Sequence, residues 1–474
     1  MPNSLAYLAL MSWPLIAVGL FMSLRLERAL IWSILAAYLL LPPVAEIDFP
    51  LLPAFDKTTI PNVAALAICM LLLGRRVAWL PRSVAGRVLT VLFVASPAAT
   101  VLTNGDYIAL GGGGFLPGLR IHDALSAIML QIMTLAPFIL ARQFLSTDAA
   151  QREILVAFVI AGLAYSIPML TEMRLSPQTN VWIYGFFQHD FTQTVRYGGY
   201  RPIVFLPHGL WVAFFTMMCL LSAVALWRHD RSKWRRRFGP AAIYLGGLLV
   251  LCKSAAALVY AAFLVPVVAV AGARLQLTLA LALAMTAVCY PLMRGAEILP
   301  ADAIVSWVEE RDPQRAESLD YRFGNETVLL DKAWQKPFFG WGSWGRNHVY
   351  DPDTGRMTTV TDGRWIIVIG TLGWFGYFGE FGLLTLPLWL VWRASAGGRG
   401  RDLAPCVGPL ALMVGINMVD MLPNATLTTL TWLMAGSVLG YAEAMAAGLR
   451  PSPAQADPAA GDAAPAAVRP RTIL

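Results

Sequence analysis

The sequence predicts an all-α polytopic membrane protein, and three observations support this fold class. Of its 474 residues, 57% are hydrophobic and only 14% are charged, whereas a soluble protein carries about 25% charged residues. Apolar runs of about twenty residues, long enough to cross a bilayer as helices, recur along the whole chain. These runs are unbroken, which excludes the alternating pattern of an outer-membrane β-barrel.

Thirteen apolar segments are candidate spans, and from them we expect about 12–13 transmembrane helices. They cover residues 5–23, 29–45, 61–74, 88–103, 122–145, 153–172, 203–226, 239–252, 254–273, 275–293, 366–392, 403–421 and 425–446. Only Lys253 and Ser254 separate the eighth segment from the ninth, so these two segments form either one helix or two. The first segment lacks a basic leader and a small-residue cleavage site, which indicates a retained span.

Positive charge sets the predicted orientation, with the N-terminus outside. In this orientation the short inner loops hold eighteen Lys and Arg residues, and the short outer loops hold three, Lys57, Arg120 and Lys253. Helical membrane proteins show this excess of positive charge on the cytoplasmic side. The basic run WRHDRSKWRRR, residues 227–237, is therefore interpreted as a topology anchor near anionic lipid, and not as a nucleic-acid site.

The charge and apolar patterns divide the chain into four parts. Residues 1–293 contain the first ten spans, and residues 294–365 form a large outer loop that is long enough for a small subdomain. Residues 366–449 contain the last three spans. Residues 450–474 are rich in Ala and Pro, which predicts a disordered tail on the cytoplasmic side.

The large outer loop contains a predicted helix followed by a glycine-rich turn. The helix, DPQRAESLDYRFGNETVLLDKAW, has Asp312 as its N-cap and Pro313 as its first helical residue. Arg315, Arg322 and Glu326 fall on one stripe of this helix, either as a solvated Arg–Glu pair or as part of an anion site. The segment that follows, QKPFFGWGSWGRNHVYD, predicts a tight amphipathic turn at the membrane interface.

A second group of ionisable residues lies where the seventh predicted span begins. In RYGGYRPIVFLPHGLW, Arg196 and Arg201 precede the span, and His208 lies within its first turns. Such residues usually face the interior of the bundle or a wet cavity. The alternative is that the arginines reach lipid headgroups and His208 is hydrogen-bonded to a neighbouring helix. Glu380, in the glycine-rich GWFGYFGEFG, is expected to make a buried structural hydrogen bond.

These segments resemble the O-antigen polymerase and O-antigen ligase superfamily of bacterial inner-membrane proteins. RYGGYRPIVFLPHG is similar to the family's Arg-x-x-Gly stretch before a helix, and YRFGNETVLLDKAWQKPFFGWGSWG to its arginine-bearing helix and Pro-φ-φ-Gly-x-Gly turn, where φ is an apolar residue. TDGRWIIVIGTLGWFGYFGEFGLL is similar to its segment that re-enters the membrane with a Gly-x-x-Gly pattern. LCKSAAAL, which contains Lys253, stands where many relatives have a Ser/Arg-type turn.

The resemblance implies a multi-pass glycosyltransferase of the inner membrane, with a C-type bundle and one large periplasmic loop. Its donor is an oligosaccharide on undecaprenyl diphosphate. The sequence contains no acidic metal-binding motif, so neither a metal nor a cofactor is expected. A polymerase passes this glycan to another lipid-linked repeat unit, giving exopolysaccharide, capsule or O-antigen, whereas a ligase passes it to lipid A–core. A chain-length regulator and a flippase are the family's usual partners. A transporter or flippase of lipid-linked sugars is the alternative from a different class.

An arginine clamp suits a diphosphate leaving group, because guanidinium groups are permanently charged and donate two parallel hydrogen bonds. The predicted substrate-binding residues are Arg196, Arg201, Lys253, Arg315, Arg322 and Arg364. The acceptor hydroxyl needs a base, for which the candidates are Asp362, His208 and His348. Ligases of the family carry a histidine followed by ten residues and a glycine. Here Asp362 and Gly373 have that spacing, which favours a polymerase and makes Asp362 the first candidate.

Overall fold

The structure is a computed structural model, and it describes residues 1–196, 198–396 and 403–448. The first helices are α1 (Ser4–Ser23), α2 (Leu26–Leu40), α3 (Thr59–Ala67) with the π-helical turn η1 (Ile68–Leu72), α4 (Val84–Leu102), α5 (Ile121–Phe144), α6 (Asp148–Leu175), α7 (Thr179–Tyr184) and α8 (Gly209–His229). They are followed by α9 (Arg235–Leu251), α10 (Ala255–Val270), α11 (Ala273–Gly295), α12 (Ala301–Glu309), α13 (Pro313–Trp334), α14 (Arg364–Ala396), α15 (Val407–Asp420) and α16 (Thr429–Ala446).

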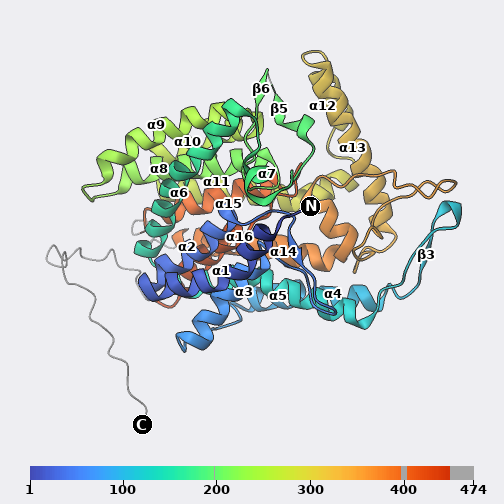
Figure 1. Cartoon of the computed structure of the whole chain (residues 1–474), viewed down its shortest axis with the longest axis horizontal. Helices are drawn as coiled ribbons and strands as arrows, with labels where there is room; N and C mark the ends of the chain where they lie inside the picture. The colour runs from blue at the N-terminus through green and yellow to red at the C-terminus, as the bar shows by residue number, and fades with distance from the viewer. Residues whose placement is uncertain (197, 397–402, 449–474) are drawn as a thin grey trace, which may run out of the picture.

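Three short antiparallel hairpins lie between these helices. They pair β1 (Glu46–Ile47) with β2 (Phe55–Asp56), β3 (Ile108–Ala109) with β4 (Phe115–Leu116), and β5 (Val195–Arg196) with β6 (Gly199–Tyr200). The short 3-10 helices η2 (Gly111–Gly113) and η3 (Phe191–Thr194) lie beside them. Figure 1 shows the long helices packed side by side, with α12 and α13 projecting from one side of the bundle. The predicted tail, residues 450–474, lies outside the described residues.

Seven of the described helices are long and apolar enough to cross a membrane, namely α1, α4, α5, α6, α8, α11 and α14. Each of the thirteen predicted segments contains a helix, so the prediction of a helical, multi-pass membrane protein is supported. The other six, α2, α3, α9, α10, α15 and α16, are shorter or less apolar. The eighth and ninth segments form two separate helices, because the chain turns at Lys253, whose φ is 52°.

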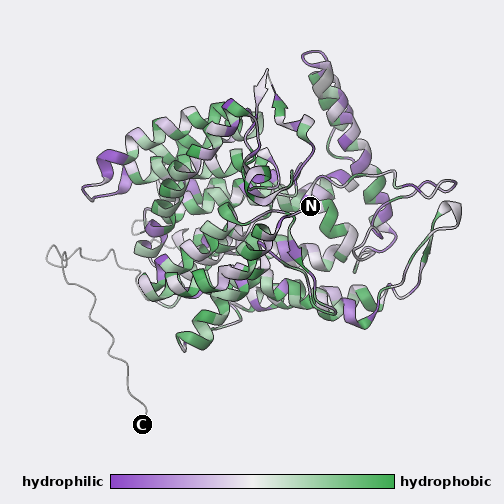
Figure 2. Cartoon of the chain, viewed as in Figure 1, coloured by the Kyte–Doolittle hydropathy of each residue, from purple (hydrophilic) through white to green (hydrophobic). Residues whose placement is uncertain are grey.

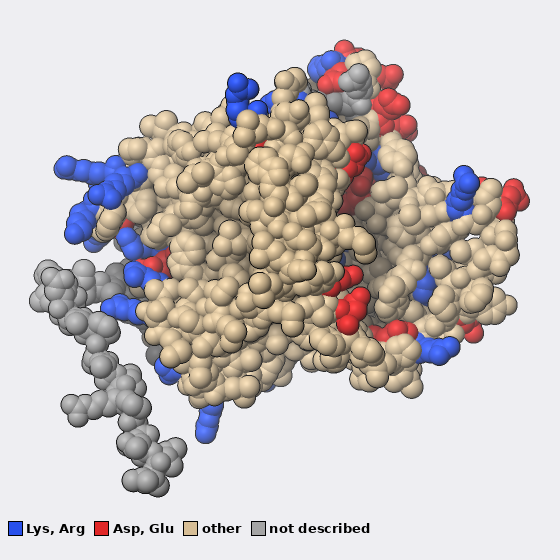
Figure 3. Space-filling model, viewed as in Figure 1, with Lys and Arg blue, Asp and Glu red and all other residues tan. Residues whose placement is uncertain are grey.

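Charged side chains gather at the two ends of the bundle. Figure 3 shows Lys and Arg concentrated at one end of the visible face, and most of the visible Asp and Glu toward the other. The surface between them is largely uncharged, and Figure 2 shows that its helices are predominantly hydrophobic. The α8–α9 loop and the first turn of α9 together carry much of the positive charge. This separation matches the charge asymmetry on which the predicted orientation rests.

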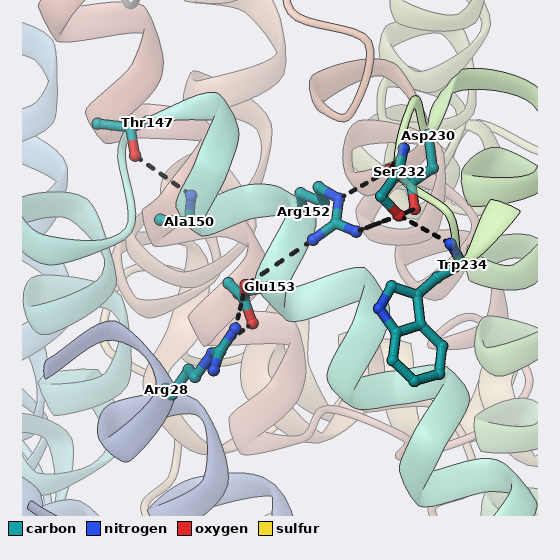
Figure 4. A network of polar contacts seen from close by, with 8 residues as sticks. All are labelled: Arg28, Thr147, Ala150, Arg152, Glu153, Asp230, Ser232 and Trp234. Carbon is teal, nitrogen blue, oxygen red and sulfur yellow. Dashed lines mark hydrogen bonds and ion pairs between the residues drawn. The ribbon is translucent and has the colours of Figure 1, made fainter. Parts of the chain in front are cut away.

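Part of the basic end is a network of ion pairs that ties α2, α6 and the α8–α9 loop together (Figure 4). Arg28 lies 2.9 Å from Glu153, and Arg152 lies 2.9 Å from Asp230. Ser232 donates a hydrogen bond of 2.7 Å to Asp230. Because these charges are paired with one another across helices, they act in the packing of this end as well as in its topology.

Small residues let some of the helices approach closely. Where α16 crosses α5, a Cβ atom at Gly436 would lie 2.2 Å from the carbonyl oxygen of Phe138. Helices in lipid gain stability from such close packing, since lipid tails supply no hydrophobic force between them. The backbones of α5 and α16 are therefore held in contact by glycine at this position.

α14 is broken at Gly373, where φ is 66° and ψ is −168°. The glycine-rich turn after α13 packs against this break through four backbone hydrogen bonds. They join Trp341 N to Gly370 O (2.8 Å), Gly342 N to Thr371 O (2.9 Å), Trp374 N to Pro337 O (2.8 Å) and Phe375 N to Phe338 O (3.2 Å). Backbone groups freed by a break in a membrane helix need partners inside the protein. The turn supplies these partners, so the second and third segments of the family resemblance form one structural unit.

We expect Gly373→Ala to destabilise the protein by at least about 2 kcal/mol, because a residue with a side chain is strained in this conformation. The new Cβ would lie 2.3 Å from the carbonyl oxygen of Phe338. Tryptophan fluorescence during thermal unfolding in detergent measures the change. The matched control is Gly247→Ala on α9, where a Cβ meets no atom within 4 Å. Equal unfolding midpoints for the two variants would contradict the proposed strain.

Candidate functional site

The structure brings four of the predicted residues into one group, which we call the cationic cluster. It consists of Arg196, Arg201, His208 and Lys253, together with His189. The Nζ atom of Lys253 donates a 2.8 Å hydrogen bond to the carbonyl oxygen of Arg196, and the rings of His189 and His208 are 4.5 Å apart. The cluster joins the β5–β6 hairpin and the α9–α10 turn to the start of α8.

Arg201 is the most buried cation of this cluster, with only 4% of the residue exposed. Its Nε and Nη2 atoms are buried and have no hydrogen-bond partner. Within the part of the chain that the structure describes, no ion pair joins Arg196, Arg201 or Lys253 to a carboxylate. Burial, and then the charge of Arg196, lower the pKa of Arg201 to about 10, so it stays charged at neutral pH. A buried charge without a partner is costly, which indicates a site for an anion.

Side chains from distant elements hold the loop between Arg201 and His208. The carboxylate of Glu172 accepts hydrogen bonds from the N–H groups of Ile203 and Val204. The hydroxyl of Tyr165 accepts one from the N–H of Phe205. On the carbonyl side, Gln188 donates to Val204 and Leu206, and Lys57 donates to Phe205. Val204 has a φ of 53°, a conformation that is rare for a β-branched residue. These contacts fix the backbone conformation of the loop, including the strained Val204. The loop therefore holds Arg201 and His208 in a fixed position.

The prediction that His208 lies within the first turns of a span is wrong. α8 begins at Gly209, and His208 is its N-cap, because the preceding backbone groups are bonded to other side chains and cannot form a helical turn. Its Nδ1 atom accepts the N–H of Leu210 at 3.0 Å, and its Nε2 atom lies 3.3 Å from Oε1 of Gln193. Burial and the charge of Arg201 lower the pKa of His208 to about 3. The ring is therefore neutral, and both nitrogens are occupied, which favours a positioning role over that of a free base.

A second group forms where α13 meets the segment before α14. Arg322 lies 3.5 Å from Asp362, and both line a pocket of about 320 Å³ together with Glu326. Glu326 pairs with Arg294 at 3.4 Å, and not with Arg322. Helix α13 begins at Pro313, as predicted. Arg315 lies on the same helix, but its side chain is outside what the structure describes.

Arg364, the first residue of α14, forms a two-point ion pair with Glu380. The distances are 2.7 Å and 2.5 Å, and Glu380 is only 1% exposed. The expectation that Glu380 makes a buried structural contact is confirmed. The charge of Arg364, which was predicted to bind substrate, is therefore already paired within the protein.

The three predicted catalytic residues lie in three different places. His208 belongs to the cationic cluster, and Asp362 lies beside Arg322. His348 lies in another pocket, where its Nδ1 atom is 3.1 Å from the carbonyl oxygen of Thr359. Among the described residues, no hydrogen bond or ion pair joins His208, His348 and Asp362 to one another.

A cavity of about 480 Å³, which we call the central cavity, lies next to the loop that follows Arg201. Pro207, Trp211, Lys57 and Arg364 are among its lining residues. Lys57 was counted only for topology, because its place in AFDKTT, between two apolar segments, indicates an outer-loop charge and nothing in the sequence links it to a cavity. Burial lowers the pKa of Lys57 to about 7, against the charge of Asp56, which raises it. His189 was also missed, since nothing in the sequence links it to His208.

Comparisons with known proteins add no assignment to these residues. No family model matches the chain, and no curated protein matches it. The chemistry of the cationic cluster and of the cavity therefore has to be argued from their residues and their geometry.

Proposed function

We propose that this protein is a glycosyltransferase of the bacterial inner membrane that joins saccharide repeat units carried on undecaprenyl diphosphate. The observation that carries the proposal is the buried, unpaired guanidinium of Arg201 within the cationic cluster. An anion bound there satisfies its free N–H groups. The resemblance of the surrounding segments to polymerases of this kind supplies the class of substrate.

A diphosphate leaving group develops negative charge when the glycosidic bond to it breaks. Fixed cations lower the energy of that state most strongly where water is excluded, because they need no reorganisation during the reaction. Arg201 is buried, the charge of Arg196 acts on it, and Lys253 donates to the carbonyl oxygen of Arg196. Among the described residues none of the three forms an ion pair with a carboxylate. In our proposal these three residues bind the donor diphosphate and stabilise its departure.

The acceptor hydroxyl attacks the anomeric carbon of the donor sugar and loses its proton to a base. Asp362 remains our candidate for this role, since it is a partly exposed carboxylate whose nearest cation is Arg322, at 3.5 Å. His208 contributes differently, because its ring caps α8 and orients the first turn beside Arg201. In this proposal His208 is a positioning residue.

In the proposed topology the bundle has about 12–13 spans, and residues 294–365 form the periplasmic loop. The starts of α5, α8, α14 and α16 and the ends of α2 and α4 then lie at the periplasmic face. The central cavity takes its lining from these ends. A flippase that supplies the donor and a chain-length regulator are the expected partners.

The test is a profile of undecaprenyl-linked glycans in cells that lack the protein, with the outward-facing and inward-facing pools sampled separately. We expect single repeat units to accumulate on the outer leaflet, and expression of the wild-type chain to remove them. Long glycans left on the carrier would identify a ligase. Units trapped on the inner leaflet would identify a transporter and overturn the proposed function.

A further inference from the structure

The central cavity has the size and position of a ligand site. Its volume of about 480 Å³ is within the range of about 300–1,000 Å³ that small-molecule sites occupy. Residues from α2, α4, α5, α8, α14 and α16 line it, so it is bounded by elements far apart in the sequence. The loop of residues 203–207 links it to the cationic cluster, since Pro207 lines the cavity and Lys57 is bonded to Phe205 at 2.8 Å.

The lining of the cavity combines hydroxyl and amide groups with aromatic rings. The polar residues include Thr58, Gln131, Thr134, Ser343, Thr371 and Thr428, and the aromatic residues are Tyr38, Trp211 and Trp432. Hydroxyl and amide groups exchange hydrogen bonds with sugar hydroxyls, and rings cover the apolar faces of a sugar. Thr371 and Thr428 already form side-chain hydrogen bonds within the protein. A lipid tail would leave the other four side chains without partners, so the lining favours a saccharide.

Two groups at the cavity have unused hydrogen-bonding capacity. Trp432 is only 1% exposed, and its Nε1–H has no acceptor, although a buried indole N–H normally has one. The ammonium of Lys57 has three donors, of which one goes to the carbonyl of Phe205. These free donors point to a ligand with several acceptor atoms.

Lys57 is the lining cation that forms no ion pair in the described part of the chain, and the adjacent carboxylate of Asp56, whose charge acts on Lys57, also lines the cavity. The other lining cation, Arg364, is paired with Glu380. The neighbouring carboxylate, Asp56, accepts the N–H groups of Thr58 and Thr59 at 2.8 Å each. Within the described residues Lys57 forms no ion pair with any carboxylate. Since burial lowers the pKa of Lys57 to about 7, a negatively charged group on the ligand would hold its side chain in the charged form.

We infer that this cavity binds a saccharide that bears a carboxylate, with the acidic group held by the ammonium of Lys57. This inference rests on the proposed function for its meaning, because such a saccharide would belong to the acceptor repeat unit, away from the hydroxyl that meets Asp362, which lines a separate pocket. The acceptor and donor sites then lie on the two sides of the loop that carries Arg201. Lys57 becomes a residue that selects acidic over neutral acceptors.

The inference is tested by direct binding to the purified full chain in detergent, without turnover. The probes are the methyl glycoside of a glucuronic acid disaccharide, the matching neutral glucose disaccharide, and inorganic phosphate as a competitor. We expect the wild-type protein to bind the acidic disaccharide at least tenfold more tightly than the neutral one. Lys57→Met should remove this preference and leave binding of the neutral disaccharide unchanged.

Two further variants keep the result interpretable. Lys336→Met is the matched control, because Lys336 also bonds to a backbone carbonyl, that of Thr103 at 3.0 Å, but does not line the cavity. It should keep the preference. Gln131→Leu alters a cavity residue for which the described part of the chain shows no hydrogen bond, and it should weaken both disaccharides.

The inference is overturned if the wild-type protein shows no preference for the acidic disaccharide, a result that does not depend on any variant folding. It is also overturned if Lys57→Met keeps the preference. Full displacement of the acidic disaccharide by phosphate at equal concentration would assign the Lys57 site to a phosphate. Binding does not require catalysis, so failure here leaves the glycan profile as a separate test of the proposed function.

Discussion

Arg201→Met is expected to reduce polymer formation at least a hundredfold and, at the same time, to raise the thermal stability of the protein. Removing one preorganised donor from a transition-state site typically costs about 10²–10³ in rate. The same guanidinium is buried, and its Nε and Nη2 atoms lack partners in the folded protein. Replacing it with an apolar side chain of similar length should therefore stabilise the fold by about 1 kcal/mol or more.

The stabilisation should not depend on pH near neutrality. The pKa of Arg201 is lowered from its ordinary value to about 10 by burial, so the side chain is charged at every pH below that value. The cost of holding the charge is fully present there, and it fades only as the pH rises through about 10. We expect the same increase in unfolding midpoint at pH 6 and at pH 8.

The measurements are polymer length on gels, protein yield in the membrane fraction, and the unfolding midpoint in detergent. Arg196→Met is the control, since Arg196 is exposed at the edge of the β5–β6 hairpin and its replacement should change stability by less than about 0.5 kcal/mol. Normal polymer from Arg201→Met would contradict its role in donor binding. A lower unfolding midpoint would show that the guanidinium stabilises the fold.

Arg364→Met is expected to destabilise the protein by about 3 kcal/mol, because it leaves a buried carboxylate without its partner. Glu380 is 1% exposed, and each of its two carboxylate oxygens accepts a hydrogen bond from Arg364. The double variant Arg364→Met/Glu380→Met should recover most of this loss, since replacing a whole buried pair with apolar groups is often neutral. Unfolding in denaturant, analysed as a double-mutant cycle, measures the coupling.

The exposed pair of Arg28 and Glu153 provides the matched control for this cycle. The side chain of Arg28 is 52% exposed, so Arg28→Met should change stability by less than about 1 kcal/mol. If Arg364→Met instead folds like the wild-type protein but makes no polymer, the guanidinium acts on substrate, as the sequence analysis predicted. If the double variant is as unstable as the single one, the two residues are not coupled.

The helical segments were predictable because the requirement for them is local. A chain in lipid must satisfy its backbone hydrogen bonds within each segment, so an apolar run of sufficient length is a helix. The start of α8 was not predictable in this way. The backbone of residues 203–206 is bonded to Glu172, Tyr165, Gln188 and Lys57, and these partners come from other parts of the chain.

Some residues of the candidate site are neighbours in the sequence, and others are brought to it only by the fold. Arg196, Arg201 and His208 are close in sequence, so one short stretch contains all three. Lys253 joins them only because the turn between α9 and α10 folds back onto β5. Nothing local distinguishes Lys57 from a lysine that merely marks an outer loop, because its place at the cavity depends on six helices from other parts of the chain.

The sequence by itself determined the helical membrane-protein class, the places of the helices and the basic end of the bundle, since these depend on composition and on short-range periodicity. Only the tertiary structure decided the state of each charge. Asp362 and Arg364 are two residues apart, yet one pairs with Arg322 and the other with Glu380. The energy of a charge depends on its burial and on its partners, and both are set by segments that are distant in the sequence. For that reason the pairing of Arg364 and the unpaired state of Arg201 emerge only in the folded chain.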